Sequence, residues 1–122
     1  MGNSTEQVSI HQKALTMYHN AALTATKIEV ATGKRKLFGC FLENLNNVPV
    51  YLHLYDADSD DVTVGTTTPT FSIPIPPQGY VDRLLAVPWK EFGTALTIAI
   101  TTSKTGGTGT PDSTCLCNLN YI

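Results

Sequence analysis

Two alternating apolar runs, joined by a polar loop and interrupted by prolines, constrain the fold of this chain most. They lie within residues 48–76, which read VPVYLHLYDADSDDVTVGTTTPTFSIPIP. Successive side chains of a strand point to opposite faces, so alternate apolar residues share one face of each strand. These residues are Val50, Leu52, Leu54, Phe71, Ile73 and Ile75. The pattern predicts an antiparallel β-sandwich without helices.

Length and composition fit one all-β domain. A chain of 122 residues suits a single core. Charged residues make up only 15% of the chain, below the usual quarter, and threonine, which favours pleated and half-buried surfaces, is abundant. A formal net charge of −2 provides no basic face for the phosphate backbone of a nucleic acid. We therefore expect no nucleic-acid partner.

The chain also carries no membrane or export signal that the sequence makes visible. No apolar run approaches the roughly 18–20 residues that cross a bilayer. The N-terminus lacks the basic region, apolar core and small-residue cleavage site of a secretory signal. We expect a protein made in a cytoplasm, with no membrane partner.

Turn residues divide the chain into seven or eight expected strands. Residues 22–31 and 35–44 are predicted strands, joined by a turn at Gly33 because glycine adopts a positive φ cheaply. Asparagines at 44–47 mark the next turn. Each of these turns is expected to join two antiparallel strands.

The spacing of the turns indicates the architecture. Turns every 8–14 residues are typical of a sandwich or jelly roll, and an immunoglobulin-like arrangement stays open. We predict a single-domain, jelly-roll-like β-sandwich over residues 21–122, preceded by an irregular arm or loosely held first strand over residues 1–20. Pro74 and Pro76 cannot donate ladder hydrogen bonds, so the strand that contains them is expected at a sheet edge.

Three cysteines allow two interpretations. Cys115 and Cys117 share one face of the final strand, and Cys40 lies in an apolar strand. Buried free thiols that act as small hydrophobes are the favoured interpretation. A metal site built on the C-x-C pair stays open, but the second ligand pair of a zinc ribbon or finger is missing.

The acidic loop DADSDD, residues 56–61, resembles the opening of a calcium-binding loop. An EF-hand is excluded because its sixth position holds Asp61 in place of glycine and its twelfth holds Thr67 in place of glutamate. A looser calcium site through Asp56, Asp58 and Asp60 stays open beside a simple solvated loop. No other metal and no cofactor is expected.

The sequence offers no catalytic residues. It contains no G-x-S-x-G, H-E-x-x-H or phosphate-binding loop motif. His53 lies between Tyr51 and Tyr55, on the strand face opposite Leu52 and Leu54, and we expect it on an exposed contact surface. The chain is therefore predicted not to be an enzyme.

Two further clusters could bind a partner. The basic residues GKRK, 33–36, could steer an anionic partner or only solvate a turn. Trp89, with Tyr80 and Phe92, could form a sugar-stacking platform or an aromatic corner that fills the end of the sandwich.

Over residues 20–122 the chain resembles small virion structural proteins of tailed phages. The short motifs that carry the resemblance are Leu54-Tyr55-Asp56, Val64-Gly65-Thr66, Thr68-Pro69, Ile73-Pro74-Ile75-Pro76 and Ala99-Ile100-Thr101. The resemblance implies a sandwich fold and a non-enzymatic capsid decoration or cement protein on the capsid surface. It implies the major capsid protein as partner and brings no catalytic residues.

A decoration protein of this size is expected to associate with itself, and we predict a homotrimer. Its contacts are expected in residues 1–20 and in the loops 56–68 and 103–113. The residues expected to bind partners are His11, Tyr18, His53, Tyr55 and Trp89. The alternative is a carbohydrate- or receptor-binding module of a phage tail or head fibre, which would use Trp89, Tyr80 or the Asp56–Asp60 loop.

Overall fold

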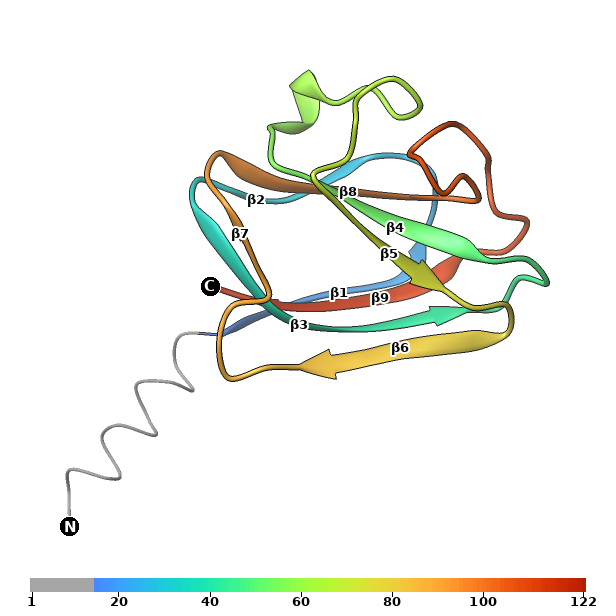
Figure 1. Ribbon diagram of the computed structural model, residues 1–122, viewed down its shortest axis with the longest axis horizontal. Coiled ribbons are helices and arrows are strands. Elements are labelled where there is room, and N and C mark those ends of the chain that lie inside the picture. Colours follow the sequence, from blue (N-terminus) through green and yellow to red (C-terminus); the bar gives the residue numbers. More distant parts are fainter. Residues whose placement is uncertain (1–14) are drawn as a thin grey trace, which may run out of the picture.

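The computed structural model describes residues 15–122, which form a β-sandwich (Figure 1). Within this range there are nine strands and one short 3₁₀ helix. The elements are β1 (Thr16–Leu23), β2 (Ile28–Thr32), β3 (Arg35–Asn44), β4 (Val50–Tyr55), η1 (Ser59–Asp61), β5 (Phe71–Ile75), β6 (Gly79–Leu84), β7 (Lys90–Phe92), β8 (Ala95–Thr101) and β9 (Cys115–Tyr121). No helix in this range is long and apolar enough to cross a membrane.

The strands form two antiparallel sheets with the topology of a jelly roll. The first sheet has the order β1-β9-β3-β6, and the short β7 also pairs with β3. The second sheet has the order β2-β8-β4-β5. The chain passes repeatedly from one sheet to the other, as in double-sheet jelly rolls. The predicted fold class is confirmed. With β7 the described residues form nine strands, one more than the seven or eight expected.

The predicted turns are present, but two of them do not form hairpins. Gly33 has a φ of +79°, as expected for the turn after β2. However, β2 pairs with β8, whereas β3 pairs with β9, β6 and β7. The turn after β3 likewise leads from the first sheet to the second. The expected antiparallel pairs are wrong because these short turns are corners between the two sheets.

The prediction of one continuous strand over residues 22–31 is also wrong. Leu23 ends β1 in the first sheet and Ile28 begins β2 in the second, so the residues between them cross the sandwich. Residues 16–20 belong to β1, which pairs with β9 from Thr16 onward. Residues 16–20 are therefore part of a first strand, which was the alternative to an arm, and residues 1–14 lie outside the described range.

The main core lies between the sheets and confirms the predicted faces of the central strands. Its fully buried members include Leu52, Leu54, Ile75, Ile98 and Leu119. The cysteines Cys40, Cys115 and Cys117 are buried and free, which confirms the interpretation as small hydrophobes. Burial, assisted by neighbouring charge, raises the pKa of Cys40 to about 11 and that of Cys117 to about 12. These thiols are therefore protonated at neutral pH.

A second, smaller core covers the outer face of the second sheet. It consists of Tyr55, Val62 and Ala99, with Ala57 and Val64 packed against them. The loop between β4 and β5 lies over the sheet at this place (Figure 1). Three hydrogen bonds hold it: Lys27 Nζ donates to the Val62 carbonyl, Ser59 N–H to Glu29 Oε1 (2.7 Å), and Thr97 Oγ1 to the Ala57 carbonyl (2.7 Å). Both faces of β8 are consequently buried.

The proline-containing strand lies at a sheet edge, as predicted. β5 is the last strand of the second sheet and pairs only with β4. Ile73 and Ile75 are buried, while Pro74 is exposed. Proline has no N–H to offer, so this edge is poorly suited to pairing with another strand.

Candidate binding surfaces

His53 is buried within a hydrogen-bond network under the loop that follows β8. Its Nδ1 lies 2.7 Å from Ser72 Oγ, and its Nε2 lies 2.9 Å from Thr101 Oγ1 and 3.0 Å from the Ser103 carbonyl. A carbonyl only accepts, so Nε2 carries the proton and Nδ1 accepts from the Ser72 hydroxyl. In a catalytic triad the histidine N–H donates to a carboxylate, whereas here His53 donates to the Ser103 carbonyl.

The prediction that His53 lies on an exposed contact surface is wrong. Its side chain is fully buried, and so is that of Tyr55, because the loops over the second sheet cover the outer face of β4. Among the described residues the buried Tyr55 hydroxyl has no hydrogen-bond partner. Neither side chain is accessible to a partner in this structure.

The neutral, buried state of His53 predicts a loss of stability in mild acid. Desolvation by burial lowers the pKa of His53, although the Ser103 carbonyl opposes this shift. The unfolded chain therefore binds the proton more readily than the folded chain. We expect full stability above about pH 6.5, and a falling free energy of unfolding as the pH drops from there through the lower pKa of the folded state.

Urea unfolding at pH 7.5, 6 and 5 measures this effect. The variant His53→Gln should be less stable at pH 7.5 but show a flatter dependence on pH. The matched variant His19→Gln replaces an exposed histidine on β1 and should retain the dependence on pH that His53 produces. An unchanged slope in His53→Gln would contradict the assignment.

Asp56 stabilises the turn between β7 and β8 through hydrogen bonds and does not contribute to a calcium site. Its Oδ2 accepts from Gly93 N–H (2.9 Å), and its Oδ1 accepts from Thr94 N–H (2.7 Å) and Ala95 N–H (3.4 Å). Burial raises the pKa of Asp56, but these three donors and the charge of Lys90 lower it overall. The carboxylate therefore acts as a structural anion.

Asp58 and Asp60, the other two residues of the candidate calcium site, do not join Asp56 in a cluster. Asp58 and Asp60 are exposed, and Asp60 lies in η1. Across residues 15–122 no group of three or more His, Cys, Asp or Glu side chains is placed to hold a metal ion. The loose calcium site considered from the sequence is not formed, because the oxygens of Asp56 already accept backbone hydrogen bonds.

The aromatic residues considered as a sugar platform are dispersed. Trp89 packs edge-on against Phe71, with ring centroids 5.2 Å apart, and Tyr80 packs against Phe41, with centroids 5.9 Å apart. Phe92 is buried in the core. Along β3, Tyr80 lies beside Glu43 while Trp89 N–H donates to the Leu37 carbonyl, so six residues, about 20 Å of strand, separate them.

The remaining predicted contact residues have different positions. Tyr18, on β1, is half-buried against the core, and its hydroxyl accepts from Asn20 Nδ2 (3.1 Å). Trp89 is also half-buried. His11 lies outside the described residues.

The structure reveals an apolar edge that sequence analysis missed. It consists of Tyr80, Leu84, Leu85 and Val87, on β6 and the segment that follows it. Leu84, Val87 and Tyr80 are 63–66% exposed, and β6 is the last strand of the first sheet. In Figure 1 this strand runs along the margin of the sandwich. The unbroken apolar run Leu84–Val87 was the signal in the sequence, because an alternating strand with one buried face would not contain it.

The apolar edge owes its shape to an irregularity in β3. A register shift between Leu37 and Gly39 marks a β-bulge, and β6 stops pairing with β3 at Leu84, opposite Gly39. Leu85 N–H still donates to the Phe38 carbonyl (3.0 Å) and Trp89 N–H to the Leu37 carbonyl (2.7 Å), and β7 resumes the pairing at Leu37, so residues 86–88 leave the sheet between the two strands. The register also places Met17, Asn120, Gly39 and Leu84 in one row across the sheet. Met17, which is 64% exposed, therefore lies in the same row as Leu84, with Asn120 and Gly39 between them.

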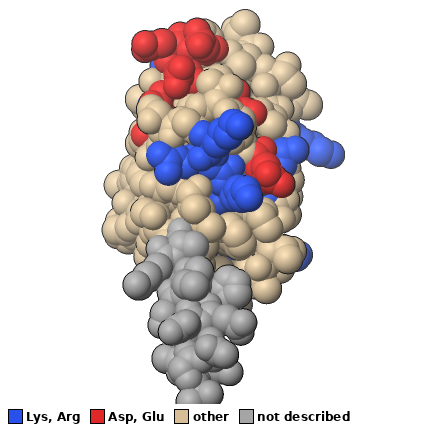
Figure 2. Space-filling model, turned by 90° about the vertical axis from the view of Figure 1, so that its left-hand side faces the viewer, with Lys and Arg blue, Asp and Glu red and all other residues tan. Residues whose placement is uncertain are grey.

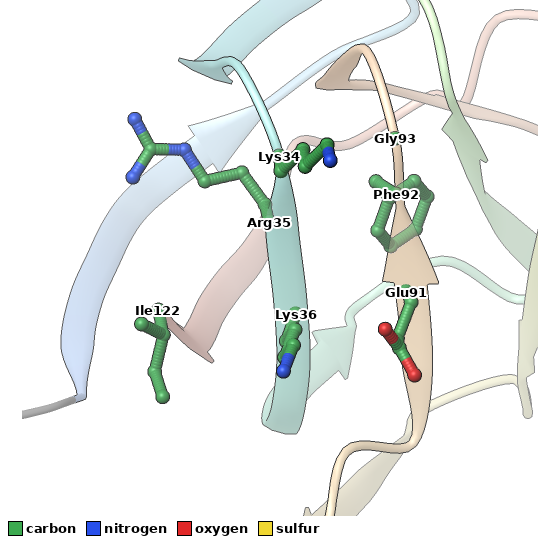
Figure 3. A pocket seen from close by; sticks show the side chains of 7 residues that line it. All are labelled: Lys34, Arg35, Lys36, Glu91, Phe92, Gly93 and Ile122. Atoms are coloured by element: carbon green, nitrogen blue, oxygen red, sulfur yellow. The ribbon is translucent and has the colours of Figure 1, made fainter.

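A basic hollow lies at one end of the sandwich, with a cavity volume of about 480 Å³. Its lining residues are Lys34, Arg35, Lys36, Glu91, Phe92, Gly93 and Ile122. Figure 2 shows Lys and Arg side chains gathered near the middle of this end, with acidic side chains at the top and also directly beside them. Figure 3 shows Lys34 extending towards Gly93, and Lys36 on the strand between Ile122 and Glu91.

Comparison with known proteins adds little. No family model and no curated protein matches this chain. A solved crystal structure of PirA aligns with 89% of this chain and 94% of its own, with 11% sequence identity and a TM-score of 0.41. A similarity of this degree supports no conclusion about function.

Proposed function

We propose that this protein is a non-enzymatic structural component of a phage virion, a decoration protein that binds the outer surface of the capsid. The observation that carries the proposal is the apolar edge, which is exposed on an edge strand and on the segment that follows it. The resemblance of the sequence to tailed-phage structural proteins supplies the biological setting.

The apolar edge has the properties of an interface. Exposed apolar side chains that form a contiguous patch mark protein contacts more often than isolated ones do. Tyr80 and Leu84 share one side of β6 with the exposed Asp82 between them, and the contiguous apolar part is Leu84, Leu85 and Val87, where the chain leaves the sheet. Burying such side chains stabilises a complex by about 1.5–3 kcal/mol each when the fit is good.

The rest of the molecule favours the same role. The edge strand β5 is blocked by prolines, whereas β6 presents unpaired backbone groups along the first sheet. In the proposal, three copies associate with one another and with the major capsid protein through surfaces that include β6. The fibre-borne carbohydrate module considered from the sequence is not proposed, because its aromatic platform is not assembled.

Co-sedimentation with empty heads of the encoding phage tests the proposal. We expect the protein to bind the heads, and Leu84→Asp combined with Val87→Asp to weaken binding about 100-fold, because two apolar contacts are replaced by buried charges. Both side chains are exposed, so the fold should persist. The control Thr26→Asp adds a charge at an exposed position between β1 and β2 and should bind normally.

The oligomeric mass is measured on the same samples by light scattering. A mass of three chains for the wild type supports the association. A folded protein that ignores the heads at micromolar concentration would refute the proposed function, as would equal binding by the double Asp variant.

A further inference from the structure

The two edge strands of the first sheet are the places at which that sheet can be extended. Within residues 15–122, β1 pairs only with β9, and β6 pairs only with β3. We propose that β1 of one copy of this chain pairs with β6 of the next copy, so that their first sheets join head to tail. The inference specifies the self-association within the proposed function and rests on it, but its test needs no capsid.

The directions of the strands allow this join. Each neighbouring pair in the path β1-β9-β3-β6 is antiparallel, so β1 and β6 run in opposite directions. A second copy in the same orientation therefore places its β1 antiparallel to β6 of the first copy, and the ladder of backbone hydrogen bonds can continue. The edge strand β5 of the second sheet is less suited to this, because Pro74 has no N–H to donate.

The rows of side chains across the sheet define the register of the join. On the outer face, Met17 and Leu84 lie at opposite ends of one row. His19 and Asp82 lie at opposite ends of the next row on the same face. When both rows continue into a second copy, Leu84 lies opposite Met17 of that copy, and Asp82 lies opposite its His19. One register satisfies both pairs, because the two rows are neighbours.

Both of these pairs are complementary. Met17 and Leu84 are 64% and 65% exposed, so the join would remove two large apolar side chains from water. The side chains of His19 and Asp82 are exposed, and His19 Nδ1 is hydrogen-bonded to Asn118 Oδ1. In the cationic ring Nε2–H is left to donate to the carboxylate of Asp82. Apolar pairs and pairs of opposite charge on facing strands stabilise a sheet.

Two-fold pairing of like edges fits less well. If β6 paired with β6 of a second copy around Asp82, the two carboxylates would lie opposite each other, which is unfavourable. Pairing of β1 with β1 around His19 would oppose two histidines in the same way. A head-to-tail contact uses two different surfaces of each copy and can close into a ring. Such a ring is what the proposed association of three copies requires.

Variants that block one edge each test the join, by size-exclusion chromatography with light scattering and without capsids. The wild type should have the mass of three chains at about pH 6.5, where an exposed histidine is roughly half protonated. Met17→Asp blocks the β1 side, and Leu84→Asp blocks the β6 side. Each variant alone should lose about tenfold or more in association, because a carboxylate would be buried against an apolar side chain.

An equimolar mixture of the two blocked variants gives the opposite result. It should form dimers, because the intact β6 of Met17→Asp meets the intact β1 of Leu84→Asp. A concentration of about 0.5 mM is used, since a single contact lacks the avidity of a closed ring. The control Thr63→Asp adds the same charge at an exposed position of the β4–β5 loop and should associate as the wild type does.

Exchange of the facing charges tests the register. His19→Asp sets two carboxylates opposite each other and should weaken association about fivefold. The double variant His19→Asp, Asp82→His restores a complementary pair in reversed order and should regain most of this loss. A merely structural role of either residue would not produce the recovery, so its absence would refute this register.

Three results would overturn the inference: a monomeric wild type, dimers of Met17→Asp alone, or no association when the two blocked variants are mixed. Dimers of Met17→Asp would indicate a two-fold pairing of β6 with β6. A monomeric wild type that binds phage heads would refute the join and leave the capsid binding intact. A trimer that joins as described but ignores the heads would support the join and refute the proposed function.

Discussion

Asn44→Ala is expected to lower the free energy of unfolding by about 3 kcal/mol, although the residue lies in a turn-forming Asn-rich stretch. Asn44 is fully buried at the end of β3. Its Nδ2 donates to the carbonyls of Val48 (2.9 Å), Pro76 (3.1 Å) and Ile75 (3.2 Å), which share its two hydrogens. Its Oδ1 accepts from the backbone N–H and the side-chain amide of Asn46, at 2.8 and 2.9 Å.

The loss would spread beyond the turn. Asn46 exchanges two hydrogen bonds with the backbone of Ser113, at 2.6 and 3.0 Å, so the pair Asn44–Asn46 joins the β3–β4 turn to the loop before β9. Alanine at position 44 leaves several buried polar groups without partners, each of which costs about 1–3 kcal/mol.

Urea unfolding followed by circular dichroism measures this loss. Asn47→Ala is the matched control: Asn47 is exposed in the same turn and only accepts from Gln78 Nε2 (3.1 Å). It should cost less than about 0.5 kcal/mol. Equal effects of the two substitutions would show that Asn44 has no special role.

Gly39→Ala should destabilise the protein by about 2 kcal/mol, with the damage concentrated in β6. A methyl group at this position would collide with the Arg83 carbonyl oxygen and would lie 3.0 Å from Leu84 Cα and Cδ1. Backbone atoms cannot move aside as a flexible side chain can, so β6 must shift away from β3. Because β6 carries part of the apolar edge, the capsid binding that we propose should decline together with stability.

Hydrogen exchange of the β6 amides locates the effect, and urea unfolding gives its size. The control is Gly93→Ala, because a methyl group there would meet only Asp56 Oδ2 at 3.7 Å. If β6 exchanges no faster in Gly39→Ala than in the wild type, the close approach of the two strands is not a requirement of the fold.

The strand faces could be predicted from the sequence because burial follows a period of two. Leu52, Leu54, Ile73 and Ile75 are buried as expected, and the prolines of β5 correctly indicated an edge. The pattern could not show which strands pair, since a corner and a hairpin use the same turn residues. Only the three-dimensional arrangement shows that β2 and β3 belong to different sheets.

The candidate sites were harder to predict for a different reason. Alternation implies that the face of β4 opposite Leu52 is exposed, but the β4–β5 loop places Val62 and Val64 over Tyr55 on this face. His53, under the loop that follows β8, is buried with hydrogen-bond contacts to Ser72, Thr101 and Ser103. The basic residues 33–36 were visible in the sequence, whereas Glu91 and Phe92 join them only because β7 pairs with β3.

The loops over the second sheet give the sandwich two unlike sides. A partner with a flat surface can contact uncovered strands only on the first sheet. The outer face of the second sheet is covered by the β4–β5 loop and by the residues that hold this loop in place. Copies attached by their bare side would all turn Asp58, Asp60 and Asp61 outward. A capsid covered by copies in this orientation would have a uniformly anionic outer surface. Its colloidal behaviour would then depend on these three aspartates of each copy.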